Sequence, residues 1–366
     1  MRILNIHSRK GGVGKTSIAL STSVQLAAKG YKTALLDLDM MGTHLVNSLP
    51  LRPHVSWADG SYWIRTDNDR RSEPGPDSKG TPFGRDTVFW NKILIGLHTQ
   101  DKLRDTTEAL MTLCLPDDLQ RSSPATAKMI SNLHLMPGSC FIRDIDAASH
   151  YVYNRQGQDR FKRFLSRTAK DLAEQGFDYL VLDNSPGLSL SPGLNLDWTL
   201  SIPESKNEWE CHCWFICGSA PWEPGLVYYE MLGMPQHQLQ RLKSLVLIVN
   251  EVGTTYRGLE EGGIYDVGLG DRHGHLVEAI SSIPIWQYAP VREKDFVRKY
   301  VKPIPAKVAL LGSDIGITDS VREREADHGL WSDWSEKYVR GFIEPAVNSE
   351  SKFHKQIRHL ISETLN

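Results

Sequence analysis

The chain lacks the features of a secreted, membrane-spanning or nucleic-acid-coating protein. Its 366 residues include only 5 cysteines, and their scattered spacing does not indicate the disulfide framework of a small secreted domain. No uninterrupted apolar run is long enough to cross a bilayer, and residues 1 to 6 are typical of a strand rather than a signal peptide. The 42 Lys and Arg nearly balance the 44 Asp and Glu, so only a local basic face could bind nucleic acid. We therefore expect a cytoplasmic protein.

A glycine-rich loop follows the first expected strand, residues 4 to 8, and precedes an apolar helical stretch. The order of strand, loop and helix is the one that a phosphate-binding loop requires. Glycines let backbone N–H groups approach phosphate oxygens, a lysine reaches the terminal phosphates, and a threonine hydroxyl can ligate Mg²⁺. The residues that we expect to bind the nucleotide here are Gly11, Gly12, Val13, Gly14, Lys15, Thr16 and Ser17.

The loop departs from the ordinary P-loop pattern, because Arg9 stands at its usual first glycine. The run from Lys10 to Thr16, Lys-Gly-Gly-Val-Gly-Lys-Thr, resembles the deviant Walker loop of the ParA/MinD family of ATPases. The resemblance implies ATP and Mg²⁺ as cofactors and an ATP-dependent homodimer. It also implies that Lys10 reaches the phosphates of the partner subunit's nucleotide, where an added cation stabilises the charge that develops in phosphoryl transfer.

Two carboxylates end the next expected strand, residues 33 to 39. Side chains alternate along a strand, so Asp37 and Asp39 share a face at the carboxyl end, where ligands bind in α/β sheets. Taken alone, such residues are more often turn or capping residues. The family has Asp-x-Asp here, which implies that Asp39 positions the attacking water and that Asp37 lies near Mg²⁺.

A third strand signal ends in Asp183. Residues 179 to 182 are apolar, and a carboxylate after a buried strand is the form of a Walker B element that holds the Mg²⁺ hydration shell. The segment resembles the family's Walker B strand, with Pro186-Gly187 kept. The predicted metal-side residues are Thr16, Asp37 and Asp183.

Two later strand ends complete the expected nucleotide site. Residues 245 to 250 resemble the family strand whose terminal asparagine reads adenine, and the amide of Asn250 can pair with both edges of that base. Ile283-Pro284 resembles the family's strand end that flanks the nucleotide, which makes Pro284 a further binding candidate. Trp286 could stack on the base, but a core tryptophan is the better-supported interpretation.

The fold class that these segments predict is α/β, a doubly wound, mostly parallel sheet flanked by helices. We expect one P-loop ATPase domain over residues 1 to 310, with an insertion at about 51 to 132, and a C-terminal helical extension over 311 to 366. Within the insertion, residues 65 to 86 are typical of a loop. Its tryptophans, Trp57, Trp63 and Trp90, indicate either a partner surface or, as we favour, packing onto the main core.

Cys211, His212, Cys213 and Cys217 suggest a metal site at first sight. They lack the paired Cys-x-x-Cys spacing of a zinc site, and we interpret residues 211 to 217 as a buried strand.

Two cationic segments bear on possible partners. Residues 292 to 302 combine five bases with two acids, a pattern that fits non-specific DNA binding or, as we favour, a solvated helix face. Residues 351 to 366 form an amphipathic helix, which could lie on a membrane as in MinD-like relatives, or dock on the sheet, as we favour. Its apolar stripe consists of Phe353, Ile357, Leu360, Ile361 and Leu365.

The sequence therefore predicts a dimerising switch ATPase that positions or partitions a cargo, with hydrolysis stimulated by dimerisation and by a protein partner. The alternative is a soluble ATP-binding regulatory subunit that gates an effector enzyme, without DNA or membrane binding.

Overall fold

The computed structural model describes two compact units of the chain. The first comprises Met1–Thr22, Pro186–Asp314 and Glu350–Asn366, and the second comprises Ser23–Ser185 and Ile315–Ser349. The described residues are 1–40, 44–53, 87–100, 104–115, 117–121, 123–139, 142–187, 190–202, 209–220, 223–252, 262–266, 307–312, 338–348 and 351–365.

The first unit is built on a mostly parallel sheet. Its strands, in spatial order, are β1 (Arg2–Ser8), β7 (Glu210–Cys217), β8 (Ser244–Val252), β10 (Lys307–Gly312) and β9 (Ile264–Asp266). All neighbours pair in parallel except β9, which is antiparallel to β10. Because β7 and β8 are buried on both faces, most of their residues are apolar, whereas β1 also buries the polar side chains of Asn5 and His7.

Helices cover the sheet of the first unit. They are α8 (Leu190–Ser201), α9 (Glu223–Gly233), α10 (Gln236–Leu239) and α17 (Lys352–Thr364), and α1 (Lys15–Lys29) begins in this unit. One buried cluster joins Leu200 of α8 and Met231 of α9 to Phe215 and Leu247 of the strands. This cluster is part of the hydrophobic core of the first unit.

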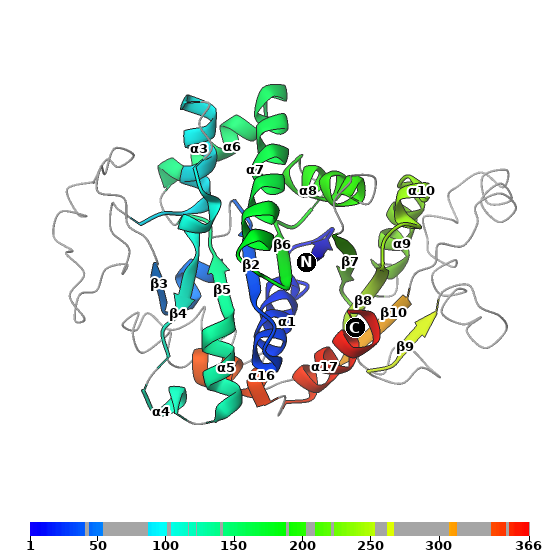
Figure 1. The fold of residues 1–366 in the computed structure, drawn as a ribbon. Helices are drawn as coiled ribbons and strands as arrows, with labels where there is room; N and C mark the ends of the chain where they lie inside the picture. The colour runs from blue at the N-terminus through cyan, green and yellow to red at the C-terminus, as the bar shows by residue number, and fades with distance from the viewer. Residues whose placement is uncertain are drawn as a thin grey trace, which may run out of the picture. The chain divides into compact units, whose positions relative to one another are not determined.

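The C-terminal helix α17 docks on β10, as the docking interpretation predicted (Figure 1). The five residues of its apolar stripe are all buried. The Ser21 hydroxyl and the His354 ring nitrogen Nδ1 lie 2.8 Å apart, which ties α17 to the helix that follows the glycine loop. The apolar face of α17 is therefore occupied by its own unit.

The second unit has a mixed sheet. In spatial order its strands are β3 (Leu51–Pro53), β4 (Met111–Leu113), β5 (Leu133–Met136), β2 (Thr33–Leu38) and β6 (Tyr179–Asn184). β5, β2 and β6 are parallel, and β4 runs antiparallel to both of its neighbours. Over the two units, five of the described strand pairs are parallel and three are antiparallel, so the prediction of a mostly parallel sheet flanked by helices is confirmed.

Three helices of the second unit, α3 (Trp90–Gln100), α6 (Ile142–Val152) and α7 (Arg155–Glu174), pack against one another (Figure 1). Trp90, predicted to pack on the core, is fully buried and packs against Phe161 and Phe164 of α7. Trp57 and Trp63 lie outside the described residues. The shorter elements are α2 (His44–Ser48), η2 (Thr106–Ala109), α4 (Asp117–Gln120), α5 (Pro124–Asn132), the π-helical turn η4 (Val339–Ile343) and α16 (Glu344–Asn348).

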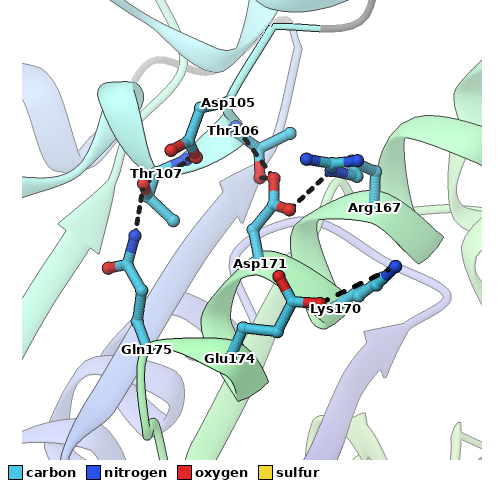
Figure 2. A network of polar contacts seen from close by, with 8 residues as sticks. All are labelled: Asp105, Thr106, Thr107, Arg167, Lys170, Asp171, Glu174 and Gln175. Atoms are coloured by element: carbon cyan, nitrogen blue, oxygen red, sulfur yellow. Dashed lines mark hydrogen bonds and ion pairs between the residues drawn. The ribbon is translucent and has the colours of Figure 1, made fainter.

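A polar network fixes the segment before β4 to α7 (Figure 2). The buried carboxylate of Asp171 accepts hydrogen bonds from the Thr106 backbone N–H at 3.1 Å and from its hydroxyl at 2.9 Å, and it also pairs with Arg167. Gln175 donates to the Thr107 hydroxyl at 2.7 Å. Because buried polar groups need partners, Asp171 holds η2 in place.

The predicted domain boundary near residue 310 stays a prediction, because residues 313 to 337 lie outside the described ranges.

Replacing Asp171 by Ala should lower the free energy of unfolding by about 2 kcal/mol, since the buried Thr106 N–H loses its acceptor. Urea denaturation of the full chain measures this change. The matched control is Glu174→Ala, which breaks the exposed pair with Lys170 and should cost less than about 0.5 kcal/mol. Equal losses for both variants would contradict the role of Asp171.

Candidate nucleotide-binding site

The loop between β1 and α1 has a backbone that only glycine adopts readily. Gly12 has φ of 76° and Gly14 has φ of 82°, both in the left-handed region. The Ile18 N–H donates to the Gly14 carbonyl at 3.0 Å, so α1 begins directly after the loop. Lys15 and Thr16 therefore occupy the first turn of a helix whose N–H groups and dipole favour an anion.

A polar cavity of about 210 Å³ opens beside this loop. Its lining comes from the loop, from residues 218 to 220 after β7, and from the end of β8. Backbone N–H groups at the carboxyl end of parallel strands are suited to phosphate oxygens. The lining residues are Lys10, Gly11, Gly12, Val13, Gly218, Ser219, Ala220, Glu223 and Asn250.

Asn250, the predicted adenine-reading residue, lies in this cavity. Its side-chain amide donates to the Val13 carbonyl at 3.0 Å and is buried. The same amide nitrogen would lie 2.5 Å from a Cβ at Gly14, so the loop and the end of β8 are in close approach. Adenine recognition by Asn250 stays a prediction, as does the role of Pro284, which lies outside the described residues.

Two glutamates of α9 hold the cations of the loop. The Lys10 ammonium lies 3.2 Å from the buried Glu223 carboxylate, which also accepts a 2.7 Å hydrogen bond from the Gly218 N–H. Arg9 pairs with Glu230 at 2.7 Å, and burial raises the pKa of Glu230. Because the Lys10 side chain is 64% exposed, its ion pair is worth little and is readily exchanged for another anion.

His7 lies on β1 just before the loop, with its ring edge-on to Phe215 at 5.3 Å between centroids. Burial, with the nearby charge of Lys15, lowers the pKa of His7 to about 4. Neither ring nitrogen has a hydrogen-bond partner among the described residues. The imidazole is therefore neutral near pH 7, and it adds no positive charge beside Lys15.

The predicted carboxylates gather at one sheet edge of the second unit. Asp37 and Asp183 are register partners at the carboxyl ends of β2 and β6, and both are buried. One oxygen of Asp37 accepts from the Asp39 N–H at 3.1 Å, and the other accepts from the Leu45 N–H at 3.4 Å. Asp37 thus shapes the turn that presents Asp39.

The donor set fits Mg²⁺, which prefers hard oxygen ligands and keeps several waters. In the second unit Asp37 and Asp183 supply adjacent buried carboxylates, and in the first unit Thr16 has a half-buried hydroxyl at the start of α1. Among the described residues, no group of three or more His, Cys, Asp or Glu side chains could hold a metal ion.

The cysteine-rich segment is a strand, as predicted. Cys213 and Cys217 of β7 belong to the buried core cluster, and burial raises the pKa of Cys211 to about 12. Such thiols stay protonated and are poor metal ligands. Cys140 lies outside the described residues.

The structure brings Lys10, the loop glycines and Asn250 together in one unit, and Asp37, Asp39 and Asp183 together in the other. Glu223 and residues 218 to 220 line the cavity but were not predicted from the sequence to belong to the site. The only local signal for them was a short Gly-Ser-Ala run at the end of a buried strand, where ligands gather.

A ParA family profile, described as NUBPL iron-transfer P-loop NTPase, matches residues 1–64. Two curated relatives match the chain over short segments, of 39 and 62 residues. An uncharacterized protein of Methanocaldococcus jannaschii, MJECL24, is 56% identical over 39 residues, which are 11% of this chain and 15% of that protein. The cytosolic Fe-S cluster assembly factor CFD1 of Kluyveromyces lactis is 37% identical over 62 residues, 17% of this chain and 22% of that protein. The chain thus aligns with less than a quarter of the length of these relatives.

Solved structures resemble the chain over a longer span. The septum site-determining protein MinD of Pyrococcus horikoshii, complexed with Mg-ADP, covers 99% of this chain and 95% of its own, with 14% identity and a TM-score of 0.47. ParA of pNOB8 covers 99% of both chains at 14% identity and a TM-score of 0.44.

Within the described residues, no helix has both the length and the apolar content needed to span a bilayer.

The neutral state of His7 predicts a pH dependence of stability. Its pKa is about 4 in the folded chain and 6.5 in a model peptide, so the unfolded state binds the proton first as the pH falls. Between about pH 7.5 and about pH 5, His7 should remove about 2 kcal/mol from the free energy of unfolding.

Urea denaturation at the two pH values tests this. His7→Leu should reduce the acid-induced loss by that amount, whereas His237→Gln, at an exposed histidine, should leave the loss as in the unmodified chain. The same loss in His7→Leu as in the unmodified chain would contradict the assignment.

Proposed function

We propose that the chain is an ATPase of the ParA/MinD type, a proposal supported by the match of the ParA family profile to residues 1–64. It binds ATP with Mg²⁺ and dimerises around the nucleotide. It then hydrolyses ATP with water to ADP and phosphate, and the dimer returns to monomers. The observation that carries this proposal is the loop itself, with left-handed glycines at 12 and 14 opening onto a polar cavity. We place the protein in the cytoplasm.

The residues of the loop bind the phosphates. The N–H groups of residues 11 to 14 and of the start of α1 donate hydrogen bonds to the phosphate oxygens, and Lys15 neutralises the charge of the terminal phosphate. Ser17, half-buried in the first turn of α1, donates to an inner phosphate. The Asn250 amide exchanges its bond to Val13 for the edge of the base.

The carboxylates serve the metal and the water. Thr16, Asp37 and Asp183 would hold Mg²⁺ and its waters, and the ion would supply charge neutralisation at the phosphate oxygens. Asp39 orients the attacking water. Its backbone is fixed for this by the hydrogen bond from its own N–H to Asp37.

Lys10 completes the site of a second copy. In the monomer its ammonium rests on Glu223 of the same chain, exposed and in a weak pair. A terminal phosphate on the partner subunit carries more negative charge than Glu223 and can compete for this cation. Hydrolysis then depends on association, since the stabilising charge arrives only in the dimer.

This cycle suits a timed switch that positions or partitions a cargo, and a protein partner stimulates hydrolysis. Small basic faces, doubled in the dimer, give such a switch its ATP-dependent DNA affinity. The basic segment at residues 292 to 302 lies outside the described residues.

One observation favours the alternative of a soluble regulatory subunit over the membrane form of the switch. The apolar face of α17, which would have to enter a bilayer, is buried on β10 and neighbouring elements.

Two variants separate nucleotide binding from turnover. Lys15→Ala should lower ATP affinity at least tenfold and abolish turnover, because the phosphate charge loses its cation. Asp39→Ala should bind ATP normally, lose at least about a hundredfold in kcat, and accumulate as an ATP-bound dimer. Equilibrium binding of a fluorescent ATP analogue, phosphate release and size-exclusion chromatography with ATP measure the three quantities. Unchanged turnover in Lys15→Ala, or only monomer in Asp39→Ala, would contradict the proposal.

A further inference from the structure

The first turn of α3 reaches the strand end that carries the predicted catalytic carboxylates. The indole Nε1–H of Trp90 donates a 2.7 Å hydrogen bond to the Asp37 carbonyl. The ladder between β2 and β5 ends one residue earlier, at Leu36 and Met136. Trp90 therefore binds the first carbonyl of β2 beyond that ladder. Trp90 itself belongs to the segment 51 to 132 that was predicted to be an insertion.

Asn91, the next residue, anchors the same turn to the end of β5. Its side-chain oxygen accepts from the Ser139 N–H at 2.7 Å, and the Ser139 hydroxyl donates to Asp144 at 2.7 Å. Asn91 and Ser139 are fully buried, and burial raises the pKa of Asp144. These hydrogen bonds lie in a buried environment of low dielectric constant, where each bond is stronger than it would be in water.

Gly138 lies where the two anchors and the backbone of Asp39 come together. A Cβ at this position would lie 3.5 Å from the Trp90 Nε1, 3.5 Å from the Asn91 side-chain oxygen and 3.8 Å from the Asp39 carbonyl. These are ordinary van der Waals distances, so the three groups pack closely around this one residue.

The Trp90 ring has little freedom to move. It is 0% exposed, and its centroid lies 6.3 Å from that of Phe161 and 5.7 Å from that of Phe164, both on α7. A fully buried ring packed against a long helix presents its N–H in one direction. The Asp37 carbonyl is therefore held against a rigid donor rather than against a mobile side chain.

We propose that Trp90 and Asn91 are positioning residues for ATP hydrolysis: they fix the end of β2 and so hold Asp39 where it orients the attacking water. The inference rests on the proposed function. The chain runs Asp37, Leu38, Asp39, and the Asp37 carboxylate receives the Asp39 N–H, so a shift of the Asp37 peptide moves Asp39. A ligand or partner that displaces α3 would thereby change the rate of hydrolysis without touching the phosphate-binding loop.

Trp90→Phe tests the proposal, since it keeps an aromatic ring and removes the N–H donor; the ring volume that it also removes is matched in the control below. We expect kcat for ATP to fall about tenfold, with the dissociation constant of a fluorescent ATP analogue within about twofold of that of the unmodified chain. Asn91→Ala, which removes the second anchor, should act in the same direction. A structural role alone would lower the melting temperature and leave the kcat of the folded fraction unchanged.

The matched control is Trp214→Phe. Trp214 is also fully buried, but it lies on β7 and its Nε1–H has no partner among the described residues. This variant should keep kcat within about twofold. If Trp90→Phe does not fold, Asn91→Ala decides by the same measurements.

The outcomes separate the two proposals. Without ATP turnover in the unmodified chain, the proposed function fails. With turnover there, unchanged kcat in both Trp90→Phe and Asn91→Ala overturns the positioning role and leaves the ATPase in place.

Discussion

The left-handed backbone of Gly12 and Gly14 is the constraint on which the site depends. A side chain at either position would be strained, so the loop can turn sharply from β1 into α1 only because these residues are glycines. The turn directs N–H groups of the loop at one cavity and places Lys15 in the first turn of the helix. Phosphate binding follows from this geometry before any charged side chain is considered.

The cations of the loop are held in ion pairs that can be exchanged for pairs with another anion. Lys10 and Arg9 are exposed cations paired with glutamates of α9, whereas His7 beneath them is buried and neutral. A buried charge would be costly to move, but an exposed pair with Glu223 contributes little to stability. Lys10 is thus available to a second copy at small cost, as a switch requires. The net charge of −2 leaves any affinity for anionic partners to such local groups.

What the sequence could predict was local. The strand, loop and helix around residues 4 to 29, and the strands that carry Asp37, Asp183 and Asn250 near their carboxyl ends, are each encoded within about ten residues, and each is present. The contacts of Glu223 with Lys10 and of Trp90 with Asp37 were not predictable, because the partners lie 213 and 53 positions apart and only the folded chain brings them together. The Asp37 carboxylate receives two backbone N–H groups, which is the turn role that the sequence had left as the alternative to metal binding.

The central claim, that Lys10 acts across a dimer, is tested most directly by mixing two inactive variants. Lys10→Ala lacks the donated cation and Asp39→Ala lacks the water-orienting carboxylate, so each alone should not turn over ATP. A mixed dimer has one complete site, in which Asp39 of one copy meets Lys10 of the other. Equal amounts should regain about a quarter of the turnover of the unmodified chain, because half of the dimers are mixed and each has one of two sites intact. Two variants that stay inactive when mixed, although both form dimers with ATP, would contradict the account.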